Sequence, residues 1–128
     1  MGSFSDDMSD RFMVFVVNII AIEKQLCKTY SGRHIFGQLF RAGTSAGANY
    51  EEARAGESRA DFIHKMQIVL KELRESHFWI KLIIAAKIIN IEGEAIGILF
   101  KESKELTNII AKSVVTAKLK VGKNPSKA

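Results

Sequence analysis

The stretch RAGTSAGANY, from Arg41 to Tyr50, decides how this sequence is interpreted. It places two glycines, three alanines, a serine and a threonine where a solvent-facing helix would carry Leu, Glu or Lys. A glycine in the interior of such a helix costs about 1 kcal/mol relative to alanine. The stretch is therefore either a loop or a helix that its neighbours approach too closely for large side chains.

Helical periodicity through the stretch favours the second interpretation. Small and apolar residues before, within and after it occupy one helix face at three- and four-residue steps: Ile35, Leu39, Ala42, Ala46, Asn49 and Ala53. Gly43 and Gly47 lie about a quarter turn from that face. We therefore predict a helix whose backbone is approached from two sides, with a kink or break from Gly43 to Gly47 as the alternative.

Three more blocks repeat the helical period. Their predicted inner faces are Phe12, Phe15, Val16, Ile19, Ile22, Leu26 and Tyr30; Phe62, Met66, Val69, Leu73, Ile80 and Ile84; and Ile96, Leu99, Leu106, Ile110, Val114 and Ala117. Gly32 is expected to end the first helix in a left-handed conformation. Ser58 and Asp61 have the spacing of a capping box, which predicts the start of the third helix. Asn90 and Gly93 mark the turn before the fourth helix.

These blocks predict an all-α domain over residues 1–120, an antiparallel up-and-down four-helix bundle. Its helices are expected at about residues 8–30, 33–55, 58–88 and 92–119, followed by a disordered basic tail over 121–128. With 128 residues, 47% of them apolar, the chain is long enough for one core without disulfides. The one cysteine, Cys27, favours a reducing cytoplasm.

Membrane insertion and secretion are not expected. The longest apolar run, residues 12–22, is too short to span a bilayer. The residues before it are acidic, where a signal peptide would carry basic residues.

No residue pattern indicates catalysis. Asp61 and His64 are three apart, but no Glu-x-x-His occurs and the predicted inner faces carry no carboxylate. The glycine cluster lacks the terminal Gly-Lys-Ser/Thr of a phosphate-binding loop. We therefore expect no enzyme activity, no metal and no cofactor. Asn49 on the inner face is expected to be hydrogen-bonded to a neighbouring helix or a backbone carbonyl, because an unpaired buried amide costs about 1 to 3 kcal/mol.

Two helices carry apolar residues on a second face. In the third helix these are Ile68, Phe78, Trp79 and Leu82, and in the first they are Met13, Val14 and Val17. Large apolar residues on both sides of a helix indicate a partner surface, so we predict a homo-oligomer, with scattered exposed apolar residues as the alternative.

A weak basic stripe is the remaining feature. The net charge is +5. The stripe lies along the second and third helices and consists of Arg54, Arg59, Arg74 and Lys81. Repeated around a ring, this stripe could hold a nucleic-acid backbone without sequence preference.

The run from Arg41 to Ile83, with its GTSAGAN core, SRADFIHK and the late pair Phe78-Trp79, resembles a bacterial four-helix-bundle family. Its members are the proteins encoded by intervening sequences in large-subunit ribosomal RNA genes, often called S23 ribosomal proteins. The resemblance implies a bundle that assembles into a ring, with a pentamer favoured because the similar accessory protein of diversity-generating retroelements forms one and works with a reverse transcriptase. Gly43, Gly47 and Asn49 match the family motif as structural residues, whereas Glu51 stands where many relatives are basic.

The sequence leads to one functional hypothesis and one alternative. The hypothesis is a non-enzymatic oligomeric bundle that binds RNA or DNA through Arg54, Arg59, Arg74 and Lys81. The alternative is a scaffold or accessory subunit for another protein, such as a reverse transcriptase, with no direct contact to nucleic acid.

Overall fold

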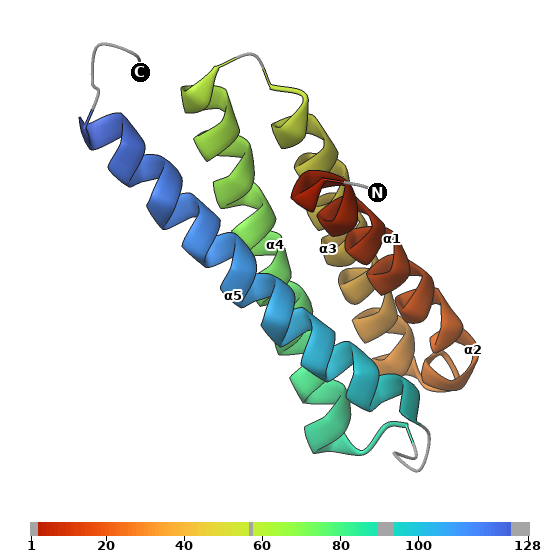
Figure 1. Ribbon diagram of the computed structural model, residues 1–128. Coiled ribbons are helices and arrows are strands. Elements are labelled where there is room, and N and C mark those ends of the chain that lie inside the picture. The colour runs from red at the N-terminus through yellow and green to blue at the C-terminus, as the bar shows by residue number, and fades with distance from the viewer. Residues whose placement is uncertain (1–2, 57, 90–93, 124–128) are drawn as a thin grey trace.

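The computed structural model describes residues 3–56, 58–89 and 94–123, and this part of the chain is helical throughout apart from its connections. The helices are α1 (Phe4–Ala21), α2 (Glu23–Leu26), α3 (Tyr30–Arg54), α4 (Arg59–Ala86) and α5 (Glu94–Lys123), shown in Figure 1. The all-α prediction is confirmed.

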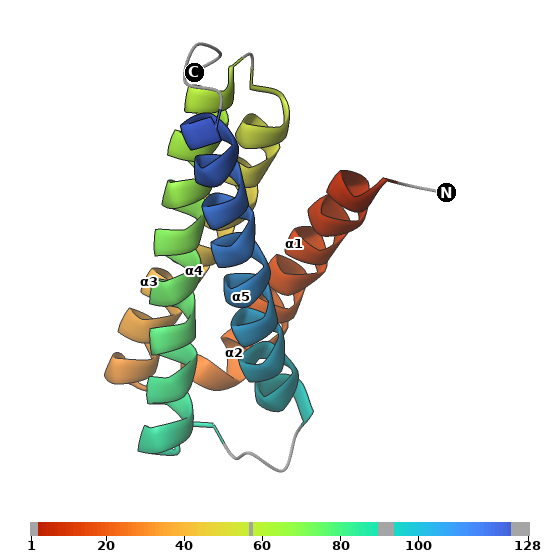
Figure 2. The same cartoon turned by 60° about the vertical axis from the view of Figure 1, so that its left-hand side comes forward.

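The four long helices run alternately in opposite directions (Figure 1). α3 packs against α1 and α4, and α5 packs against the same two helices, so that α1 and α4 lie diagonally across the bundle. Figure 2 shows that α1 leans outward at its N-terminal end, away from α5. The bundle is therefore closed at the end that holds α2 and more open at the end that holds the N-terminus.

The small residues of α3 form an unbroken helix, as predicted. Gly43 is buried, and a Cβ atom added to it would lie 2.6 Å from Cδ1 of Ile19 in α1. A Cβ atom on Gly47 would lie 3.6 Å from Cβ of Phe12. The glycines therefore let α1 approach the backbone of α3, and a break at this point is excluded.

The predicted core is largely confirmed. All six inner residues of α5, from Ile96 to Ala117, are buried, as are Ile35, Leu39, Ala42, Ala46 and Ala53 of α3. In α4 the buried residues include Met66, Val69, Leu73 and Ile80, whereas Phe62 and Ile84 are partly buried. Each stripe faces the bundle axis because its residues recur with the helical period.

The end of the first helix was predicted wrongly. α1 stops at Ala21, the short α2 follows, and Tyr30 is 81% exposed as the first residue of α3. Gly32 does not end a helix: it lies in the first turn of α3, where its amide donates to Oγ1 of Thr29 over 3.0 Å. A Cβ atom on Gly32 would lie 1.7 Å from the carbonyl oxygen of Leu26, so glycine is needed for backbone approach rather than for a left-handed turn.

Other boundaries agree with the sequence or shift slightly. The hydroxyl of Ser58 accepts from the amide of Asp61 over 3.1 Å at the start of α4, which confirms one of the two bonds of the predicted capping box. α5 continues to Lys123, which places residues 121–123 in a helix and not in a tail. Asn90, Gly93 and residues 124–128 lie outside the described residues.

Two glycines of α3 give a matched test of the packing. We expect Gly32→Ala to destabilise the fold by about 3 kcal/mol or more, because the new methyl group would overlap the backbone of Leu26. Gly37→Ala, in the same helix with nothing within 4 Å of the added atom, should stabilise it by about 0.5 to 1 kcal/mol. Urea unfolding followed by circular dichroism measures both. Equal midpoints for the two variants would contradict this account.

Candidate nucleic-acid interface

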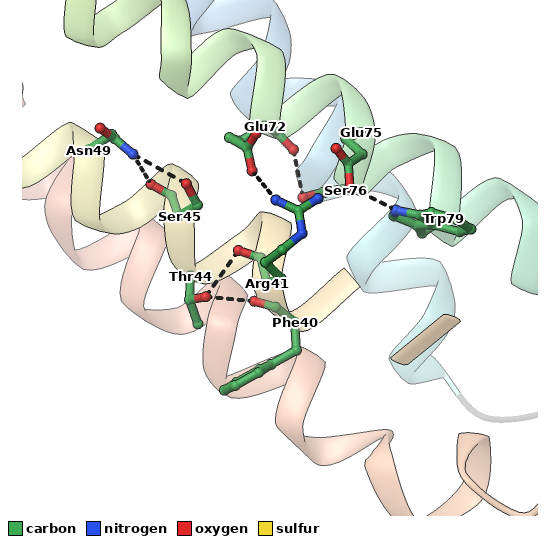
Figure 3. A network of polar contacts seen from close by, with 9 residues as sticks. All are labelled: Phe40, Arg41, Thr44, Ser45, Asn49, Glu72, Glu75, Ser76 and Trp79. Atoms are coloured by element: carbon green, nitrogen blue, oxygen red, sulfur yellow. Dashed lines mark hydrogen bonds and ion pairs between the residues drawn. The ribbon is translucent and has the colours of Figure 1, made fainter. Parts of the chain in front are cut away.

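A charged network joins α3 to α4 at the start of the RAGTSAGANY stretch (Figure 3). Nη1 of Arg41 donates to Glu72 over 2.9 Å, and Nη2 of Arg41 is paired with Glu75. The side chain of Glu72 is only 8% exposed. A carboxylate buried to that extent needs a charged partner, so Arg41 makes the burial of Glu72 possible.

Trp79 extends this network. Its Nε1–H donates to Glu75 over 3.1 Å, and its ring meets that of His34 edge-on at 6.0 Å. Burial alone would raise the pKa of Glu75, but the hydrogen bonds from Trp79 and Arg41 lower it below its usual value. Glu75 is therefore held as an anion between the two helices.

Asn49 bonds to a backbone carbonyl of its own helix, which is one of the two kinds of partner predicted for it. It is partly buried, and its amide group donates to the carbonyl oxygen of Ser45 over 2.9 Å, within α3 (Figure 3). Tyr50, the next residue, is buried instead and stacks on Phe12 of α1 at 5.0 Å. The aromatic ring takes the core position because it faces the close α1–α3 contact.

The predicted apolar faces differ in exposure. Met13, Val14 and Val17 of α1 are 67%, 54% and 54% exposed, and Ile20 beside them is 47% exposed. On α4 only Phe78, at 52%, is fully at the surface. The other three residues predicted for that face, Ile68, Trp79 and Leu82, are partly buried, and Trp79 and Leu82 pack against the core of their own chain.

The four predicted basic residues do not form one patch. Arg54 is paired with Asp6 of α1, and Arg59 lies 22 positions before Lys81 on α4. That separation corresponds to about 33 Å along the helix axis. Arg74 and Lys81, in contrast, are both exposed and lie one turn before and one turn after His77, whose ring contacts Ser103 of α5.

α5 adds a cation to this pair that sequence analysis missed. Lys104 is exposed on α5, and its charge acts together with that of Lys81 on His77, which lies between the two helices. Among the described residues, no carboxylate lies within 4.0 Å of Arg74, Lys81 or Lys104. We call Arg74, Lys81 and Lys104 the basic face.

His77 lies beneath the basic face. Its Nδ1 lies 2.7 Å from Oγ of Ser103, which donates to the carbonyl oxygen of Phe100, so Nδ1 carries the hydrogen. Burial, followed by the charges of Lys81 and Lys104, lowers the pKa of His77 below its usual value. The folded state therefore favours the neutral imidazole, mainly because the ring is desolvated and additionally because Lys81 and Lys104 are nearby.

The remaining candidates offer little chemistry. His34 and His64 are exposed, and Cys27 is a partly buried free thiol. Within the described residues, no group of three or more His, Cys, Asp or Glu side chains could hold a metal ion. None of the described helices combines the length and apolar character needed to cross a membrane.

The geometry defines an all-helical bundle with charged contacts between its helices and a separate basic face. The sequence matches the 23S rRNA-intervening sequence protein family over residues 7–112, and the chain belongs to that family. A solved structure from Bacteroides thetaiotaomicron, described as a protein of unknown function from the S23 ribosomal protein family, is 32% identical. It superposes with a TM-score of 0.75, covering 86% of this chain and 96% of the other. No curated protein matches the sequence.

His77 predicts how stability depends on pH. Because its pKa is lowered on folding, its contribution to stability is present above the unfolded pKa of about 6.5 and is lost as pH falls through the lower folded value. The free energy of unfolding should therefore drop between pH 7 and pH 5 by more in the native protein than in His77→Gln, which keeps a hydrogen-bonding side chain. Urea titrations at several pH values measure the difference. Parallel pH profiles would contradict the assignment.

Proposed function

We propose that the protein is a non-enzymatic homo-oligomer that binds RNA or DNA through the basic face. The observation that carries the proposal is the cluster of three exposed cations, Arg74, Lys81 and Lys104, without carboxylate partners among the described residues. Cations on a surface of this kind attract phosphates and release their counterions. Binding would be led by the phosphate backbone and would tolerate many sequences.

The placement of the carboxylates supports this assignment. Arg11 donates to Glu102 over 3.0 Å and to Glu105 over 2.9 Å, which uses the acidic side of α5 for contact with α1. Glu72 and Glu75 are bound by Arg41 on the α3 side of α4. These four carboxylates thus point toward other helices, away from the side on which Arg74, Lys81 and Lys104 lie.

We further propose that the oligomer is a ring, with five subunits favoured by the family resemblance. A ring joins two different surfaces of each subunit. One would be the apolar face of α1, formed by Met13, Val14, Val17 and Ile20, and the other the outer side of α4 around Phe78. α1 and α4 lie diagonally across the bundle, so one subunit can contact two neighbours at once. A ring would also bring several basic faces together and raise their combined affinity.

A protein-binding scaffold is the second candidate, favoured by the same apolar face of α1. Its partner, a reverse transcriptase among the candidates, would then cover Met13 and Val17 in place of a second copy. A solution mass equal to that of one chain, together with no binding to nucleic acid, would favour this function.

Nucleic-acid binding is tested by charge reversal. We expect Arg74→Glu combined with Lys81→Glu to weaken binding to single-stranded RNA at least tenfold at low salt and to reduce the slope of log K against log salt by about 2. Fluorescence anisotropy from 50 to 200 mM KCl, with single-stranded and structured RNA, measures both.

The matched control is Lys24→Glu combined with Lys28→Glu, which changes the net charge equally at exposed positions in and after α2. It should keep the native affinity. Absence of binding by the native protein at low salt, or equal losses in both double variants, would refute the proposed interface.

Assembly is tested on α1. Met13→Glu with Val17→Glu should give monomers, because burying two carboxylates in an apolar interface is unfavourable, while both positions are exposed in one chain. Val115→Glu with Leu119→Glu, also exposed and four apart, is the matched control on α5 and should keep the native mass. Light scattering after size exclusion measures the mass. Trp79 is a poorer probe because it packs within its own chain. Equal masses for the native protein and the α1 variant would refute this interface.

A further inference from the structure

Two adjoining cavities open at the end of the bundle where α1 begins and α5 ends. The larger has a volume of about 620 Å³ and lies between Phe4 of α1, Phe62 of α4 and Ile109 of α5. The second, about 320 Å³, is also lined by Phe4 and Phe62 and continues inward to Tyr50 and Met66. The larger volume is in the range of small-molecule sites, about 300 to 1,000 Å³. The cavities occur where α1 leans away from α5 (Figure 2).

The two cavities have an apolar interior and a basic mouth. Their inner walls are mainly apolar or aromatic, whereas Arg59 of α4 and Lys112 and Lys120 of α5 line the larger cavity. All three cations are exposed, and among the described residues no carboxylate lies within 4.0 Å of any of them. Lys112 and Lys120 are eight residues apart, about 12 Å along the helix. One anionic group at the mouth could therefore interact with Arg59 of α4 and with a lysine of α5.

We propose that this cavity binds an anionic amphiphile, a molecule with one carboxylate or phosphate group and an alkyl or acyl chain. The alkyl chain would enter between Phe4 and Phe62, where burial of its CH₂ groups removes apolar surface from water. The head group would stay at the mouth with Arg59, Lys112 and Lys120. A hydrophilic polyanion fits less well because it would leave the apolar walls uncovered. Free fatty acids and membrane phospholipids share this chemistry, and the experiment separates them.

The inference does not depend on the proposed nucleic-acid function. Lys112 lines the larger cavity near Phe4 of α1, together with Ile109 and Thr116. Lys104 and Lys81, in contrast, act on His77 between α4 and α5. The two sets of cations can therefore be changed separately.

The test is calorimetric titration of the full chain at pH 7.5 with dodecanoate, dodecanol and butyrate below their aggregation concentrations. We expect saturable binding of one dodecanoate per chain, at least tenfold weaker binding of dodecanol, and no measurable binding of butyrate. Lys112→Glu with Lys120→Glu should weaken dodecanoate binding at least tenfold. Arg74→Glu with Lys81→Glu, which reverses the same number of charges on the basic face, should leave it unchanged.

A blocking variant keeps the result interpretable. Thr116 is exposed and lines the cavity, so Thr116→Trp should fill the mouth without disturbing the core and should abolish binding, while the helical circular dichroism signal is unchanged. The proposal is overturned if dodecanoate does not saturate, or if it binds equally to the native protein and the Lys112/Lys120 variant. It is also overturned if the protein binds only to phosphatidylglycerol vesicles and not to monomeric dodecanoate, which would indicate a membrane surface contact.

Discussion

The close contact between α1 and the middle of α3 is the constraint on which the other features depend. Gly43 and Gly47 leave no side chain between the helices, so Phe12, Phe15 and Ile19 pack directly against the backbone of α3. Interiors packed to this density tolerate few changes of volume. Since α1 is held by α3, it meets α5 along only part of its length. Its outward side keeps Met13 and Val17 exposed, and its first turns diverge from α5, which leaves the cavity near Phe4.

The opposite side of α3 is bound to α4 by charged side chains. Arg41 binds the buried Glu72 and the half-buried Glu75, and Trp79 donates to the same Glu75. A buried pair of this kind contributes little net stability, because desolvation offsets the attraction between the charges. The pair instead selects one orientation of α4 about its own axis, because any other orientation would leave Glu72 buried without a partner or remove it from Arg41. The selected orientation also places Arg74 and Lys81 beside α5.

Periodicity was sufficient to predict the helices and most core residues, because each inner face repeats every three or four residues over several turns. It failed where a local interaction competes with the period. Ser3 and Asp6 form a complete capping box, which starts α1 at Phe4 rather than near residue 8, and this spacing was visible in the sequence. Thr29 is the N-cap of α3, so Tyr30 and Gly32 belong to the first turn of that helix. Asn49 and Tyr50 are adjacent, and Tyr50 is the buried one because its ring stacks on Phe12 of α1, a contact that the spacing within α3 does not predict.

The candidate site was less predictable than the fold because it depends on contacts between helices. Arg41 and Glu72 are 31 residues apart, and Arg54 and Asp6 are 48 apart, so no spacing rule connects them. The sequence showed four basic residues on two helices, but the pairing of Arg54 with Asp6 removes one of them. Lys104 on α5 joins Arg74 and Lys81 only because α4 and α5 pack side by side around His77 and Ser103. Arg11 of α1 and Arg41 of α3 bind four carboxylates of α5 and α4, so the way α1 and α3 pack leaves the basic face without these carboxylates as partners.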